Sequence, residues 1–91
     1  MNNLVKEGYI NKLKNRLFGC LCEREKNREW QSYLDSILIE LMGFPEEEKT
    51  IYYYTIFYKL TSCKYLSYEY FRKTIFDVMN LLGKEEANEL F

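Results

Sequence analysis

Residues 51–60 read IYYYTIFYKL, and whether they form a helix or a strand determines the fold class of the whole chain. Aromatic and β-branched residues are typical of strands, so the composition of this stretch alone suits a strand. The preceding PEEE (45–48) favours a helix, because proline suits the first helical position and carboxylates suit the positive end of the helix dipole. No other stretch reads as a partner strand, and a lone strand has nothing to pair with. We therefore predict a helix over 45–62, with a strand over 51–60 as the alternative.

The remaining sequence has the spacing of amphipathic helices, with apolar residues three and four apart. This spacing predicts further helices over 4–22, 27–42 and 67–82. Gly43 and Gly83 are expected to end the second and fourth helices, as glycines in the left-handed conformation often do. The predicted core residues are Tyr9, Ile10, Leu13, Leu17, Cys20 and Leu21 in the first helix, Trp30, Leu34, Ile37, Leu38 and Leu41 in the second, and Tyr68, Phe71, Ile75, Val78, Met79 and Leu82 in the fourth.

The fold class that follows is all-α. A length of 91 residues suits a single domain over 1–91, built as a small bundle of four main helices. The final residues 84–91, KEEANELF, are expected to add a short C-terminal helical turn, with Ala87, Leu90 and Phe91 folding back onto the bundle.

The side chains that most catalytic and metal sites require are scarce. The chain has no histidine, which excludes catalytic triads, Cys-His dyads and imidazole acid–base chemistry. Its three cysteines, Cys20, Cys22 and Cys63, are too few for a four-ligand zinc site and are interpreted as small apolar residues. We expect no enzymatic activity, no metal and no cofactor.

The composition also bears on location and origin. The N-terminus has no secretion signal, no stretch approaches the length of a membrane span, and we expect a cytoplasmic protein without a membrane role. Residues with A/T-rich codons, such as Lys, Asn, Ile and Tyr, are abundant, which suggests an A/T-rich genome. The chain is also small, at 91 residues. Both suit a phage or mobile-element inhibitor or regulator.

The aromatic residues indicate where a partner would bind. Ten of the 16 aromatics lie between residues 51 and 76. As a helix, 51–60 places Ile51, Tyr54 and Tyr58 on one side, and its apolar surface continues nearly all the way round, which suggests contact with a second chain. On the fourth helix, Phe76 lies among charged residues, as an anchor for a partner often does. The candidate partner-binding residues are Tyr52, Tyr53, Ile56, Glu69, Arg72, Lys73 and Phe76.

Two functional hypotheses follow from these residues. The first is a non-enzymatic protein-interaction module that binds another protein or forms a homodimer through the third helix. The alternative is a helix-turn-helix transcriptional regulator that binds DNA with helices 45–62 and 67–82. The turn between these helices lacks glycine, and the would-be recognition helix opens with Glu69, where phosphates or base edges should approach; both features weigh against DNA binding.

Overall fold

The computed structural model describes the backbone of residues 3–90 and the side chains of 8–47 and 49–83. The described chain forms four α-helices and a short 3₁₀ turn, and it contains no strand. This confirms the all-α fold class, and it resolves the conformation of 51–60 in favour of a helix. The elements are α1 (Asn3–Glu25), α2 (Trp30–Met42), η1 (Glu46–Glu48), α3 (Ile51–Cys63) and α4 (Tyr68–Leu90).

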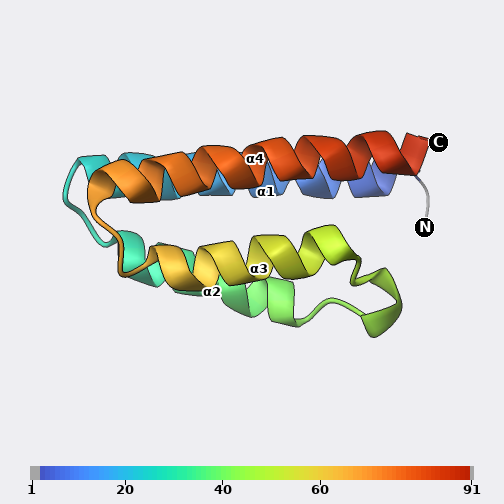
Figure 1. Cartoon of the computed structure of the whole chain (residues 1–91), viewed down its shortest axis with the longest axis horizontal. Helices are drawn as coiled ribbons and strands as arrows, with labels where there is room; N and C mark the ends of the chain where they lie inside the picture. The colour runs from blue at the N-terminus through green and yellow to red at the C-terminus, as the bar shows by residue number, and fades with distance from the viewer. Residues whose placement is uncertain (1–2, 91) are drawn as a thin grey trace.

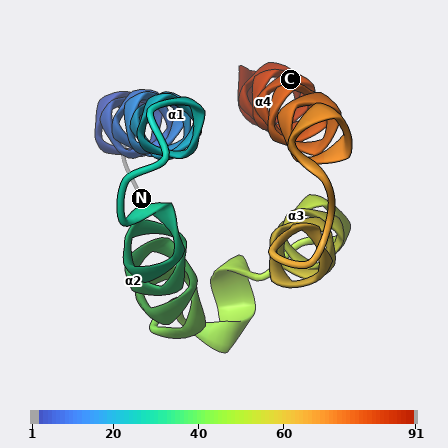
Figure 2. The same cartoon turned by 90° about the vertical axis from the view of Figure 1, so that its left-hand side faces the viewer.

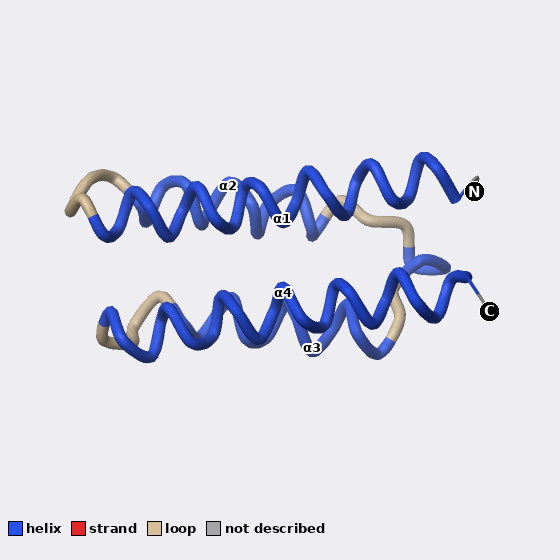
Figure 3. Tube along the Cα trace, turned by 90° about the horizontal axis from the view of Figure 1, so that it is seen from above, coloured by secondary structure: helices blue, strands red, loops and turns tan. Residues whose placement is uncertain are grey.

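The helices form an up-down-up-down bundle (Figure 1). Consecutive helices run antiparallel, and the two chain ends lie at the same end of the bundle (Figures 1 and 3). Seen along its axis, the bundle is a ring in which α1 packs on α2, α2 on α3, α3 on α4, and α4 on α1 (Figure 2). Each helix therefore keeps an outward face that no other helix covers.

The core lies along the axis of this ring and is purely apolar among the described residues. The buried residues from α1, α2 and α4 are those predicted from the spacing, while Tyr9, Trp30, Leu38 and Met79 pack around them half-buried. Tyr68 was predicted in the core but is exposed, because it begins α4 at the loop end of the bundle. The buried positions are Ile10, Leu13, Leu17, Cys20, Leu21, Leu34, Ile37, Leu41, Ile56, Leu60, Cys63, Phe71, Ile75, Val78 and Leu82.

The start of α3 differs from the prediction. The helix begins at Ile51 and not at Pro45, because the Thr50 hydroxyl accepts a hydrogen bond from the Tyr53 amide at 3.2 Å and caps the helix. The three glutamates form the separate turn η1, and the extended residue Lys49 interrupts the helical path between them and α3. Thr50 is a typical N-cap residue, but the prediction started the helix at Pro45 instead.

Of the two predicted glycine stops, the one at Gly43 is confirmed in position, because α2 ends at Met42, but its predicted left-handed conformation is wrong, and the stop at Gly83 is wrong. Gly43 follows α2 with φ −80° and is not left-handed. The left-handed residue among those described is Asn27, with φ 56°, in the turn between α1 and α2. Gly83 lies inside α4, which continues to Leu90, so the C-terminal turn extends α4 and is not a separate helix. The side chains of Ala87 and Leu90, and all of Phe91, lie outside the described residues.

Replacing Gly83 with alanine tests this continuous helix. Gly83→Ala is expected to stabilise the protein by about 0.5–1 kcal/mol, because glycine is a poor helix former and an added Cβ meets no atom within 4 Å. The free energy of unfolding from urea titration, followed by circular dichroism, measures the change. Gly8→Ala is the matched control, since Gly8 also lies in a helix and its Cβ also has open space. A loss of stability in Gly83→Ala alone would mean that the helix ends there.

Candidate functional site

The outward side of α3 carries a stripe of large apolar side chains. Ile51, Tyr54 and Tyr58 are three and four residues apart, so they lie on one face of the helix. Ile51 is 78% exposed and Tyr58 is 68% exposed. No charged residue belongs to this stripe, which is unusual for a helix face in contact with water.

Two residues of α2 extend the stripe sideways. Ile39 and Met42 follow Asp35 by four and seven residues, so the three share one face of α2. Asp35 forms an ion pair with Lys64 just after α3, which places this face of α2 beside α3. Ile39 and Met42 are both largely exposed. We call the combined surface, formed by Ile39, Met42, Ile51, Tyr54 and Tyr58, the α2–α3 face.

The neighbouring hydroxyl groups on α3 are satisfied within the helix. Thr55 donates a hydrogen bond to the Ile51 carbonyl at 3.0 Å, and Ser62 donates one to the Tyr58 carbonyl at 2.6 Å. Thr61 donates in the same way to Phe57. Because these hydroxyls already have partners, a molecule that covers this side of α3 leaves none of them unpaired.

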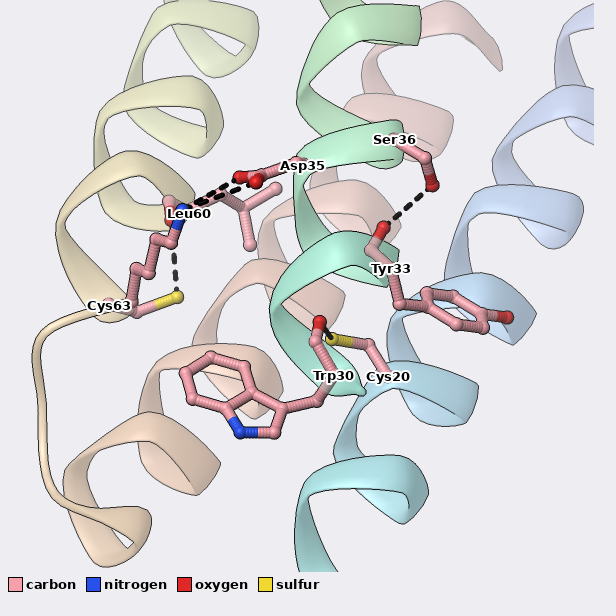
Figure 4. A network of polar contacts seen from close by, with 8 residues as sticks. Cys20, Trp30, Tyr33, Asp35, Ser36, Leu60 and Cys63 are labelled. Atoms are coloured by element: carbon pink, nitrogen blue, oxygen red, sulfur yellow. Dashed lines mark hydrogen bonds and ion pairs between the residues drawn. The ribbon is translucent and has the colours of Figure 1, made fainter. Parts of the chain in front are cut away.

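Ion pairs lie at both ends of the α2–α3 face. At one end, the Lys64 ammonium lies 3.1 Å from a carboxylate oxygen of Asp35, as the dashed contacts of Asp35 in Figure 4 show. At the other end, Lys49 lies 2.9 Å from Glu46. Their hydrogen bond lowers the pKa of Glu46 and raises the pKa of Lys49, so both stay charged at neutral pH. The carboxylates of Asp35 and Glu46, at the two ends of the face, are therefore each paired with a lysine.

The structure places four of the predicted partner-binding residues together on the outward side of α4. Glu69, Arg72, Lys73 and Phe76 are all exposed there. The Arg72 guanidinium lies 5.1 Å from the centre of the Phe76 ring, and the Lys73 ammonium lies 3.7 Å from Glu69. Arg72 thus covers part of Phe76, which is 39% exposed, and the surrounding surface is charged.

The three residues predicted on α3 lie elsewhere. Ile56 is buried in the core, so it is not available to a partner in this chain. Tyr53 is half-buried, its ring stacks with Phe44 and Phe57, and its hydroxyl donates a hydrogen bond to the Leu41 carbonyl. Tyr53 is therefore a packing residue that links α3 to α2. Tyr52 is half-buried as well.

The exposed residues of the α2–α3 face were not selected from the sequence. The spacing of Ile51, Tyr54 and Tyr58 placed them on one side of a helix, but an apolar helix gives no sign of which side faces water. Ile39 and Met42 lie off the predicted core stripe of α2, which was the signal that they reach the surface.

The cysteines are free, and two of them are buried. The thiol of Cys20 donates a hydrogen bond to the Trp30 carbonyl at 3.5 Å, and Cys63 donates one to Leu60 at 3.2 Å (Figure 4). Burial raises the pKa of Cys20 to about 12 and that of Cys63 to about 11, because an apolar environment disfavours the thiolate. No cluster of three or more potential metal-ligating His, Cys, Asp or Glu residues occurs among the described residues.

A shallow depression of about 400 Å³ lies at the loop end of the bundle. Arg24 and Trp30 line it together with Glu25, Asn27 and Tyr68. The Arg24 guanidinium is already engaged there, since it contacts the rings of Trp30 and Phe71 and donates a hydrogen bond to the Leu66 carbonyl. This arginine therefore serves to join the helix ends.

Searches against protein-family models, curated proteins and solved structures found no match. Among the described helices, none carries an apolar stretch that would cross a bilayer. The geometry and chemistry of the α2–α3 face are therefore the basis for a functional proposal.

Proposed function

We propose that the protein is a non-enzymatic protein-interaction module that binds its partner through the α2–α3 face. The observation that carries this proposal is a set of five large, exposed apolar side chains on the neighbouring helices α2 and α3. Exposed apolar patches of this kind are typical of protein–protein interaction sites. Tyrosine and methionine, which supply three of the five residues, are enriched in such interfaces.

The chemistry of the polar residues supports the non-enzymatic part of the proposal. The sequence contains no histidine to act as a general base near neutral pH. The buried thiols of Cys20 and Cys63 are held in the protonated form, which is a poor nucleophile. The carboxylates of Asp35 and Glu46, at the edges of the face, are paired with lysines.

No observation favours the helix-turn-helix alternative. In that motif the two helices meet at about 90–120°. Here α3 and α4 pack antiparallel along their length (Figure 3). The narrower idea of a phage or mobile-element inhibitor or regulator has its support in size and composition alone.

Site-specific photocrosslinking tests the proposed surface. A benzophenone amino acid in place of Tyr58 is expected to form a covalent adduct with a protein in extracts of the native cell, because Tyr58 belongs to the α2–α3 face and is 68% exposed. The same probe in place of Phe18 on α1 is the control, since Phe18 is exposed but lies on another helix. Adducts are detected as a mass shift on a denaturing gel and identified by mass spectrometry.

The two positions together decide the outcome. A protein adduct at position 58 and none at position 18 supports the proposal. The absence of an adduct at position 58, or equal adducts at both positions, would show that the α2–α3 face is not a specific docking surface.

A further inference from the structure

We infer that the occupant of the α2–α3 face is a second copy of this chain, which packs its own α2–α3 face against the first across a two-fold axis. This inference rests on the proposed function, because it names the partner of the same surface. Three properties of the face carry it: its area, the absence of charge among its five residues, and the order of exposed residues along α3.

The area is close to what a stable dimer needs. The exposed parts of Ile39, Met42, Ile51, Tyr54 and Tyr58 amount to on the order of 700 Å², given that large side chains present roughly 150–250 Å² when open. A standard protein–protein interface buries about 800 Å² on each partner. The face is thus large enough to form most of an interface without help from α1 or α4.

The charge distribution suits contact with an identical surface. In a two-fold dimer the same patch lies on both sides, so any unpaired charge near the axis meets a like charge. None of the five residues of the α2–α3 face is charged, and the nearest carboxylates, Asp35 and Glu46, are paired with Lys64 and Lys49; Glu46 also accepts a hydrogen bond from Tyr54. On the outward side of α4, by contrast, Glu69, Arg72 and Lys73 would all have to lose water.

The order of residues along α3 is compatible with an antiparallel pair. Exposed positions run from Ile51 through Tyr54 and Tyr58 to Ser62, and Tyr65 continues in the same direction. A two-fold axis near Tyr58 sets this tyrosine against Tyr58 of the partner subunit. It also brings the Ile51 end of each α3 towards the Tyr65 end of the other. Paired tyrosine rings contribute large contact area at a small cost in conformational entropy.

Light scattering coupled to size-exclusion chromatography tests the dimer. The chain has a mass of 11.1 kDa, and we expect the wild type to elute with twice that mass at about 50 µM, since association depends on concentration. Tyr58→Glu places two like charges at the axis and is expected to raise the dissociation constant by about 100-fold or more. Phe18→Glu, an equally drastic change on α1, is expected to leave the dimer intact.

Circular dichroism accompanies each variant to confirm that it folds. If Tyr58→Glu loses its helical signal, Ile51→Lys takes its place, because Ile51 is more exposed and makes fewer contacts that a mutation can damage. A wild-type mass of 11.1 kDa, or a dimer that survives a folded variant of the face, would overturn the inference.

The outcomes also separate this inference from the proposed function. A monomeric wild type whose position 58 crosslinks to a different protein contradicts the second copy and leaves the interaction module intact. A monomer with no adduct at position 58 contradicts both.

Discussion

Phe71→Ala is expected to destabilise the bundle by about 3–5 kcal/mol, the usual cost of removing a fully buried aromatic ring. Phe71 is 0% exposed and is the largest of the fully buried side chains. Its ring meets the Trp30 ring edge-on, with the centroids 5.2 Å apart. A domain of this size typically has only about 5–15 kcal/mol of stability, so the substitution removes a large part of it.

The loss extends beyond the cavity that the ring leaves. The Arg24 guanidinium lies 4.5 Å from the centre of the Phe71 ring and 4.2 Å from that of Trp30, while its Nη2 atom donates a hydrogen bond to the Leu66 carbonyl at 2.6 Å. Phe71 therefore supports an arginine that connects the end of α1 to α2 and to the turn before α4. Without the ring, part of this cation–π interaction is lost as well.

Urea unfolding measures the effect of Phe71→Ala, with Tyr70→Ala as its control. Tyr70 is the preceding residue in α4 but is mostly exposed, so its loss is expected to cost less than about 1 kcal/mol. Equal costs for the two substitutions would contradict the placement of Phe71 in the core.

We expect one of the three cysteine thiols to react fast and the other two to react slowly. At pH 8, a disulfide reagent such as Ellman's should modify the half-buried Cys22 first, and Cys20 and Cys63 at least about 100-fold more slowly. Burial raises the pKa of Cys20 from 9.0 to about 12, and each unit lowers the thiolate fraction about tenfold. The core also shields both sulfur atoms from the reagent.

The rate of colour development, in the presence and absence of denaturant, measures this difference. Cys22→Ser is the matched variant, and it should lose the fast phase while keeping two thiols that react only after unfolding. Three thiols that react at one rate in the native protein would contradict the buried positions of Cys20 and Cys63.

The same shifts predict how stability depends on pH. The pKa values of Cys20 and Cys63 are higher in the folded state than in the unfolded chain, so the unfolded chain loses its thiol protons first as the pH rises. The contribution of the protonated thiols is fully present below about pH 9 and is lost as the pH rises towards 11–12.

Much of the fold could be predicted from periodicity. The stripes of α1, α2 and α4 have one apolar side each, and their central residues, such as Leu17, Leu34 and Phe71, are all buried. The helix ends were harder, because local capping by Thr50 competed with the proline signal at Pro45. Gly83 did not end α4, since glycine permits a helix to stop but does not require it.

The candidate surface was only partly predictable. The sequence indicated an aromatic third helix and a partner-binding role, but it selected Ile56 and Tyr53, which lie in or against the core. The charged residues of α4 were placed on the surface correctly, because Phe71, Ile75 and Val78 define the buried side of that helix without ambiguity.

The sequence by itself determined that this chain forms helices around an apolar core, because the spacing of its apolar residues is intrinsic to each helix. Only the tertiary structure decided which side of α3 faces water. That helix is apolar nearly all the way round, so its orientation depends on where α2 and α4 pack against it. Once Ile56, Leu60 and Cys63 turn inward to meet those helices, Ile51, Tyr54 and Tyr58 necessarily point outward.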